Sequence, residues 1–176
     1  MYKSRQMRRM NLFTTLVTLC IVTGSAWGQK NCITLQGKTF EASLTDSTEV
    51  ALMDIPIEIW ADDSILAVIY SQDKGRYKFS LPFFHRYRVR YGGGNLISKW
   101  VEIDANNFVM PTRYKGYTLD IDIVLFKAGL VKGLEFLDTD PIARAYFSPT
   151  EKTVVWDIDL TERMNRKLED KINNAH

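Results

Sequence analysis

Hydrophobic and polar residues alternate with a period of two along most of the chain, beginning near residue 33. Such alternation is typical of β-strands that bury one face. In one run, Ile55, Ile57 and Ile59 alternate with other residue types, so one face of that strand is aliphatic. The pattern predicts seven strands, over residues 33–40, 55–61, 65–71, 77–81, 86–91, 97–103 and 117–126.

Short runs of turn-forming residues separate the predicted strands. Asp62-Asp63-Ser64 and Asp73-Lys74-Gly75 suit tight connections, and Pro82 ends the fourth strand. Residues 106–116 form the main irregular connection and carry Tyr114. Because only a second sheet or a closed barrel can cover the apolar face of each short strand, the sequence predicts an all-β sandwich.

The C-terminal part follows a different pattern. It predicts a polar connector over 128–141 and a hairpin formed by 143–147 and 153–158. A helix is predicted over 161–172. Asp159 or Thr161 is expected to cap the helix. One narrow apolar stripe with a spacing of four should dock on the sandwich or on a partner and not enter a membrane. The stripe consists of Leu160, Met164, Leu168 and Ile172.

Residues 1–28 predict an export signal. Four positive charges precede an apolar stretch over 12–22, which is short for a transmembrane helix. Small residues favour cleavage after Gly28, and an uncleaved N-terminal anchor is the alternative. Leu19 stands directly before Cys20, where a lipoprotein signal has a small residue, so no lipid anchor is expected.

The composition is that of an ordinary globular protein of 176 residues, with 45% hydrophobic and 25% charged residues. A formal charge of +2 is too even a balance to indicate a nucleic-acid partner. Removing the four positive charges of the signal from that +2 leaves the exported part at −2. Cys32 is then the remaining cysteine, which excludes an intramolecular disulfide there. Its thiol is either inert or cross-linked to a partner.

Charged residues alternate along two of the predicted strands. Arg86, Arg88 and Arg90 share one face of the fifth strand, and Asp120 and Asp122 form an acidic stripe on the seventh. If the two strands are neighbours, the two stripes neutralise each other across the sheet. The alternative is an anion-binding face for a single-stranded nucleic acid or an acidic glycan.

The sequence carries no catalytic signature. It lacks the metal-binding, phosphate-binding and nucleophile motifs of known enzyme classes, and its two histidines are His85, expected at a strand edge, and His176. The pair Asp157 and Asp159 suits a turn or a helix cap better than a calcium loop. We therefore expect no catalytic residue, metal, cofactor or enzyme activity.

Four segments carry a resemblance to a known family. They are Gly37-Lys38-Thr39-Phe40, Ile55-Pro56-Ile57-Glu58-Ile59, Ser71-Gln72-Asp73-Lys74-Gly75-Arg76-Tyr77-Lys78-Phe79 and Tyr87-Arg88-Val89-Arg90-Tyr91. In them the chain resembles the carboxypeptidase regulatory-like domain, although Ser71-Gln72 stands where that family has Thr-Asp. The resemblance implies a seven-stranded transthyretin-like or Ig-like β-sandwich over 33–127 that is not itself catalytic.

The C-terminal extension covers residues 128–176 and contains Pro141-Ile142-Ala143-Arg144-Ala145-Tyr146-Phe147-Ser148-Pro149, Val155-Trp156-Asp157 and a basic helix. In these segments it is similar to the ends of small exported proteins of Bacteroidota-type bacteria that carry this domain. Signal, sandwich and missing chemistry predict an exported module that contacts an envelope protein in the periplasm or at the cell surface. It would reach a membrane only through that partner. A carbohydrate or small-ligand binding module with stacking aromatics is the alternative. The candidate contact residues are Trp60, Arg86, Arg88, Arg90, Trp100 and Tyr114.

Overall fold

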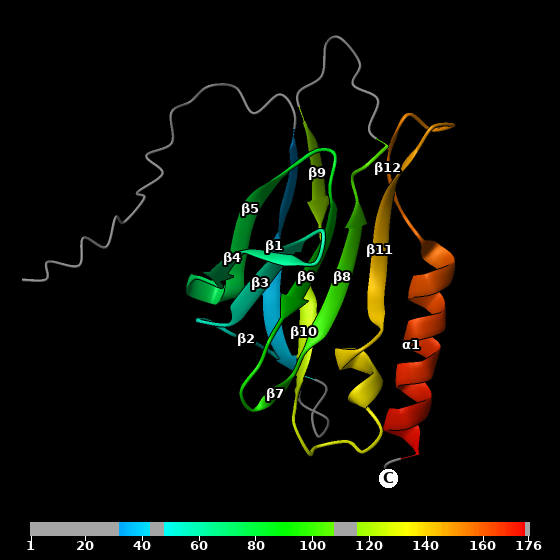
Figure 1. Ribbon diagram of the computed structural model, residues 1–176. Coiled ribbons are helices and arrows are strands. Elements are labelled where there is room, and N and C mark those ends of the chain that lie inside the picture. Colours follow the sequence, from blue (N-terminus) through cyan, green and yellow to red (C-terminus); the bar gives the residue numbers. More distant parts are fainter. Residues whose placement is uncertain (1–31, 43–47, 108–115, 175–176) are drawn as a thin grey trace, which may run out of the picture.

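The computed structural model describes residues 32–42, 48–107 and 116–174. They form two six-stranded sheets, with one long helix running along the side of the sandwich (Figure 1). The predicted all-β sandwich with a C-terminal hairpin and helix is therefore confirmed. The predicted signal peptide over 1–28 and the candidate residue Tyr114 lie outside the described residues.

The first sheet is built around one long strand, β1 (Cys32–Ala42). Its partners are β2 (Glu49–Ala51), β5 (Arg76–Pro82), β9 (Tyr117–Asp120) and β10 (Ile123–Lys127), and β7 (Leu96–Ile97) pairs with β10. The N-terminal half of β1 pairs antiparallel with β5 and parallel with β9. Its C-terminal half pairs antiparallel with β2 and parallel with β10, so β1 exchanges both neighbours along its length.

This exchange of neighbours takes place beside Gly37, where β9 ends and β10 has not yet begun. The backbone N–H of Ile121 donates to the Gln36 carbonyl oxygen at 3.0 Å, and the Asp122 carboxylate accepts from the Lys38 backbone N–H at 2.8 Å. A Cβ atom on Gly37 would overlap the Ile121 carbonyl oxygen. Glycine is therefore required for β1 and the segment between β9 and β10 to come so close.

The second sheet contains, in order across it, β12 (Thr153–Trp156), β11 (Pro141–Ser148), β8 (Lys99–Asp104), β6 (Arg86–Tyr91), β3 (Pro56–Ala61) and β4 (Ser64–Tyr70). All neighbours are antiparallel except β11 and β8. The predicted C-terminal hairpin forms β11 and β12, which continue this sheet at one edge, and β4 is the edge strand on the other side.

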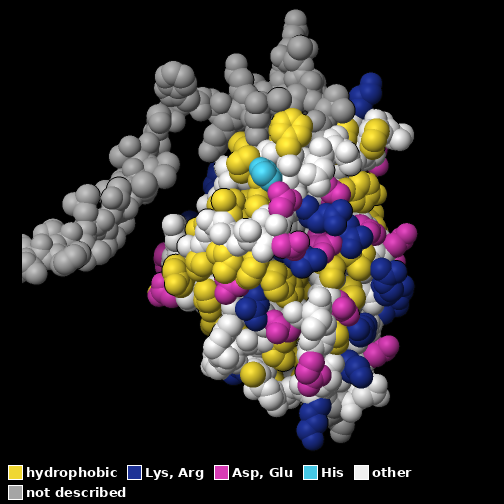
Figure 2. Space-filling view, viewed as in Figure 1, with side chains coloured by type: hydrophobic (Ala, Val, Ile, Leu, Met, Phe, Trp, Pro, Cys, Tyr) yellow, Lys and Arg dark blue, Asp and Glu magenta, His cyan; other side chains and the backbone are white. Residues whose placement is uncertain are grey.

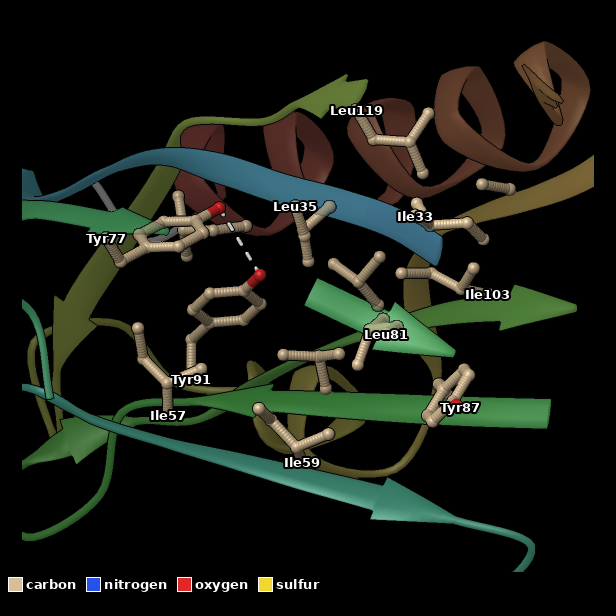
Figure 3. Packing of buried hydrophobic residues seen from close by; sticks show 14 of the residues in the cluster. Ile33, Leu35, Ile57, Ile59, Tyr77, Leu81, Tyr87, Tyr91, Ile103 and Leu119 are labelled. Carbon is tan, nitrogen blue, oxygen red and sulfur yellow. Dashed lines mark hydrogen bonds between the residues drawn. The ribbon is translucent and has the colours of Figure 1, made fainter. Parts of the chain in front are cut away.

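Aliphatic and tyrosine side chains from both sheets fill the space between them. Figure 3 shows ten of these residues with labels, among them Ile33 and Leu35 of β1 and Ile57 of β3, all three with no exposed surface. The tyrosines Tyr77 and Tyr91 point toward each other there, and the Tyr91 hydroxyl donates to the Tyr77 hydroxyl at 3.3 Å. The alternation seen in the sequence thus produces a continuous core.

The helix α1 (Ile158–Asn173) lies alongside β11 (Figure 1). Leu160 and Met164 are buried, and Leu168 packs against a second apolar cluster around Phe126. The helix begins earlier than predicted because Asp157, and neither Asp159 nor Thr161, is the N-cap. The Asp157 carboxylate accepts the backbone N–H of Leu160 at 2.9 Å, which satisfies one of the unpaired donors of the first turn.

Several predicted strands differ in their limits. The strand expected over 117–126 is broken into β9 and β10, and that expected over 97–103 is broken into β7 and β8. The short strand β2 was not predicted. Two 3-10 turns, η1 (Asp73–Gly75) and η2 (Glu135–Asp138), complete the described structure. No described helix combines the length and the apolar character that a membrane crossing requires.

Candidate functional site

The outward surface of β3, β6 and β8 brings together five of the six candidate contact residues. We call it the arginine–tryptophan face and define it by Glu58, Trp60, Arg86, Arg88, Arg90, Trp100, Glu102, Asp104 and the neighbouring Arg144 of β11. Figure 2 shows the alternation of basic and acidic side chains over this part of the molecule. The sixth candidate, Tyr114, is not among the described residues.

Strand register places each arginine of β6 opposite a defined partner on β8. Arg86 lies opposite Asp104, Arg88 opposite Glu102, and Arg90 opposite Trp100. Because successive side chains of a strand point to opposite faces, the three arginines share the outer surface while the residues between them enter the core. Tyr87, Val89 and Tyr91 have no exposed surface.

The sequence suggested that Asp120 and Asp122 neutralise the arginine row if their strands are neighbours. The strands are not neighbours, so this neutralisation does not occur. Those aspartates belong to the first sheet, at β9 and just after it, whereas β6 belongs to the second. Asp120 accepts a hydrogen bond from the Gln36 side chain at 2.7 Å, and Asp122 binds the backbone of β1. The periodicity of the two stripes was correct, but it carries no information about which strands become neighbours.

Carboxylates of the second sheet and its turns pair with the arginines instead. Arg86 lies 3.7 Å from Asp104, Arg88 lies 3.6 Å from Glu102, and Arg90 lies 2.9 Å from Asp138 of η2. Arg144 also binds Glu102, with nitrogen–oxygen distances of 2.9 and 3.0 Å. Each arginine of the face has an acidic partner, which leaves little unbalanced positive charge for an anionic ligand.

Two tryptophans lie among these ion pairs. The ring centroids of Trp60 and Trp100 are 6.4 Å apart with planes tilted by 54°, and both rings are half-buried. The Arg90 guanidinium lies 5.7 Å from the Trp100 ring centroid, within range of a cation–π interaction. The Trp100 indole N–H donates to the Asp138 carbonyl oxygen at 2.7 Å. The indole N–H of Trp100 is thus already occupied, and its ring edge is held against η2.

An apolar strip on β4 was not anticipated. Its exposed members are Ile65, Leu66, Val68 and Tyr70, each between 46% and 58% exposed. Figure 2 shows hydrophobic side chains gathered in this region, beside the charged side chains of the arginine–tryptophan face. The signal in the sequence is that residues 65–70 are all apolar or aromatic, which a strand with one solvated face would not require.

The edge of the face holds the one described histidine. His85 lies between β5 and β6 and its Nδ1 is 2.6 Å from a carboxylate oxygen of Asp62. The hydrogen bond from His85, together with the Arg86 backbone N–H, lowers the pKa of Asp62 below its usual value. Within the described part of the chain, no three His, Cys, Asp or Glu side chains cluster as a metal site would require. Cys32 is buried, 8% exposed, in β1.

Comparison with known proteins gives likeness in structure alone. No family model matches the sequence, and no curated protein matches it either. Among solved structures, the chain is similar to the TIE protein of Bacillus anthracis (TM-score 0.41, 13% identity, 55% of this chain and 17% of that one). It is similar to a minor pilin of Streptococcus agalactiae (TM-score 0.40, 11% identity, 58% of this chain and 47% of that one). It is also similar to 3-chlorocatechol 1,2-dioxygenase of Rhodococcus opacus 1CP (TM-score 0.39, 9% identity, 58% of this chain and 62% of that one).

These comparisons correct one prediction from the sequence. The expectation that the chain is not an enzyme is wrong as it stands, because the solved structures to which it is similar include catechol dioxygenases. The physical reason is that a scaffold does not determine chemistry, which resides in the side chains placed on it. The matched region spans less than two thirds of the length of each of the three proteins named above.

Proposed function

We propose that this chain is an exported module whose arginine–tryptophan face binds another protein of the cell envelope. The observation that carries the proposal is the composition of that face. Tryptophan and arginine are the residue types most enriched at the energetic centres of protein interfaces, and here they occupy one continuous surface. The paired carboxylates keep the arginines oriented, so their aromatic neighbours are presented without a large net charge.

The proposal retains two expectations drawn from the sequence. One is removal of residues 1–28 on export, with the mature chain residing in the periplasm or at the cell surface. The other is a carboxypeptidase regulatory-like domain over 33–127, followed by an extension over 128–176. The strands β11 and β12 of that extension continue the second sheet, so it supplies Arg144 to the same face. Mass measurement of the exported protein tests the first expectation.

Co-purification from cell envelopes in mild detergent tests the binding. The wild-type chain should bring a partner with it, and Arg88→Glu should lose that partner because it places a negative charge beside Glu102 and Asp63. Arg76→Glu is the matched control, since Arg76 is an exposed arginine on the first sheet. Recovery of the wild-type chain alone, or equal loss of the partner in both variants, would overturn the proposal.

The glycan alternative predicts a different result in the same set of variants. Sugar rings stack on open, flat aromatic surfaces, whereas Trp60 and Trp100 are tilted against each other and half-buried. A titration with envelope polysaccharides should therefore leave tryptophan fluorescence unchanged. A saturable change that Trp60→Ala abolishes would establish the glycan function in its place.

A further inference from the structure

The edge strand β4 presents a surface that the proposed partner binding does not use. Within the described residues β4 pairs with β3 alone, so its other side has no strand beside it. The edge strand at the opposite end of the sheet, β12, has only half-buried side chains. In β4, by contrast, Leu66, Val68 and Tyr70 are exposed by 57%, 46% and 58%.

This strand has few of the features that keep a sheet edge from pairing. Natural edges are usually protected by charged side chains, proline or a bulge within the strand. β4 reads Ser-Ile-Leu-Ala-Val-Ile-Tyr, with no charge and no proline. It has one bulge relative to β3, at Leu66, because Ile59 pairs with Ala67 and Trp60 pairs with Ile65. From Ala67 to Tyr70 the edge is regular and open to another strand.

We propose that β4 pairs antiparallel with β4 of a second copy of this chain, joining the two second sheets into one continuous sheet. Such an interface is isologous, so the strand must be complementary to itself. If Val68 lies on the two-fold axis, Ala67 faces the partner's Ile69, and the bulged Leu66 lies beside the partner's Tyr70. Leu66, Val68 and Tyr70 are exposed, whereas Ala67 and Ile69 pack against the core. The two members of each facing pair therefore lie on the same side of the sheet as each other, and both are apolar.

Charges at the two ends of β4 favour the antiparallel arrangement. Asp62 and Asp63 precede the strand, and Asp73 and Lys74 follow it. A parallel pair would place the two acidic residues beside their own copies, which is unfavourable. An antiparallel pair instead brings each acidic turn to an end that carries Lys74 as well as Asp73, so fewer like charges meet than in the parallel pair. The charges thus favour the antiparallel over the parallel arrangement of the two copies.

The small size of the contact indicates a weak association. Stable interfaces bury about 800 Å² on each partner, and one edge strand of this length with its neighbours buries less. We therefore expect a dimer that dissociates on the order of micromolar concentration, which corresponds to about 8 kcal/mol of association free energy. At higher concentration the dimer should be the main species.

Molecular mass in solution, measured over a range of concentrations, tests the pairing. The wild-type exported chain should pass from monomer to dimer, and Val68→Lys should remain a monomer because it places two like charges on the axis. Val50→Lys, on the exposed strand β2 of the first sheet, is the control and should dimerise as the wild type does. A wild type that stays monomeric at hundreds of micromolar, or a dimer that survives Val68→Lys, would overturn the proposal.

A cysteine on the axis gives a second measurement that does not depend on affinity alone. Directly opposed residues of antiparallel strands have Cβ atoms about 4.5 to 5.5 Å apart, close to what a disulfide needs. Val68→Cys should form a disulfide-linked dimer under mild oxidation, whereas Val50→Cys should not. The Arg88→Glu variant should dimerise normally. Loss of partner binding with an intact dimer would separate failure of the proposed function from failure of this inference.

Discussion

The outer face of the second sheet and the junction around Gly37 in the first sheet are both polar, but they lie in opposite environments. On the outer face, Arg86 and Arg88 meet their carboxylates with more than half of each arginine side chain exposed. At the junction, the Tyr77 hydroxyl donates to the Ile121 carbonyl oxygen at 2.5 Å and receives a hydrogen bond from the fully buried Tyr91. Water can replace a lost partner on the face more readily than between the buried Tyr77 and Tyr91 side chains, so similar contacts should differ in their effect on stability.

Gly37→Ala should give the largest effect, because it attacks the junction through the backbone. The added Cβ would overlap the Ile121 carbonyl oxygen and lie 2.7 Å from its carbon, so β1 and the segment beside it must separate. We expect a loss of about 3 kcal/mol in the free energy of unfolding, measured by chemical denaturation. Gly94→Ala is the control: its φ is +65° but no atom lies near its Cβ position, so the cost should be about 1 kcal/mol. Equal losses would show that close approach at Gly37 is unimportant.

Lys99 extends the comparison to a charge that is buried without a carboxylate. It is 5% exposed on β8, its ammonium lies 4.8 Å from the Phe126 ring centroid, and among the described residues it forms no ion pair. Burial lowers the pKa of Lys99 to about 8. Since the unfolded chain binds this proton more tightly, the free energy of unfolding should rise by roughly 2 kcal/mol between pH 7 and 10.

Lys99→Met is the control for that pH dependence. It should raise stability at pH 7 and abolish the rise above it, because no buried charge is left to neutralise. The measurement must stop near pH 10, since burial raises the pKa of both Tyr77 and Tyr91 and unfolding then becomes favoured as unfolded tyrosines ionise. A wild-type curve that is flat from pH 7 to 10 would contradict the assigned burial of Lys99.

The two hydroxyls at the junction should contribute unequally. Tyr77→Phe leaves both the Tyr91 hydroxyl and the Ile121 carbonyl without a partner, whereas Tyr91→Phe removes a donor and leaves the bond from Tyr77 to Ile121 intact. We expect losses of about 2 kcal/mol for the first variant and below about 1 kcal/mol for the second. Thermal and chemical denaturation of the two variants measure the difference. The reverse order would mean that the hydrogen-bonding direction at the junction is wrong.

The junction also shows where prediction from the sequence stops. The alternation of hydrophobic and polar residues predicted the limits of β1, β3 and β6 to within two residues. It did so because burying one face of a strand is a local requirement that the sequence must meet. The break at Ile121 and Asp122 keeps the same alternation on both sides, so the sequence predicted one strand there. Its cause is a contact with Gly37, more than eighty positions away, and no local pattern reports it.

The same distinction applies to the arginine–tryptophan face. The sequence predicted that Arg86, Arg88 and Arg90 share one surface, and it selected Trp60 and Trp100 as further candidates. Their partners depend on which strands become neighbours, and that follows from the order of the whole sheet. The exposed strip of β4 was missed for a related reason: an apolar strand suits a buried position, and only the sheet order reveals that β4 lies at an edge.

Breaking the ion pairs of Glu102 should give the smallest loss of stability. It also tests the exposed outer face most directly. Its carboxylate meets Arg144 at 2.9 Å and Arg88 at 3.6 Å, and its side chain is 17% exposed. Arg144→Gln should cost about 0.5 to 1 kcal/mol and Arg88→Gln only a few tenths, because the longer contact on a half-exposed side chain is weakened by solvent. Raising the salt concentration from 0.1 to 1 M should remove most of the difference, since screening shortens the range of exposed charge interactions but leaves the hydrogen bonds at the junction unchanged. If Arg88→Gln instead costs as much as Tyr77→Phe in both salts, the face is held as rigidly as the buried junction, and the contrast between the two regions fails.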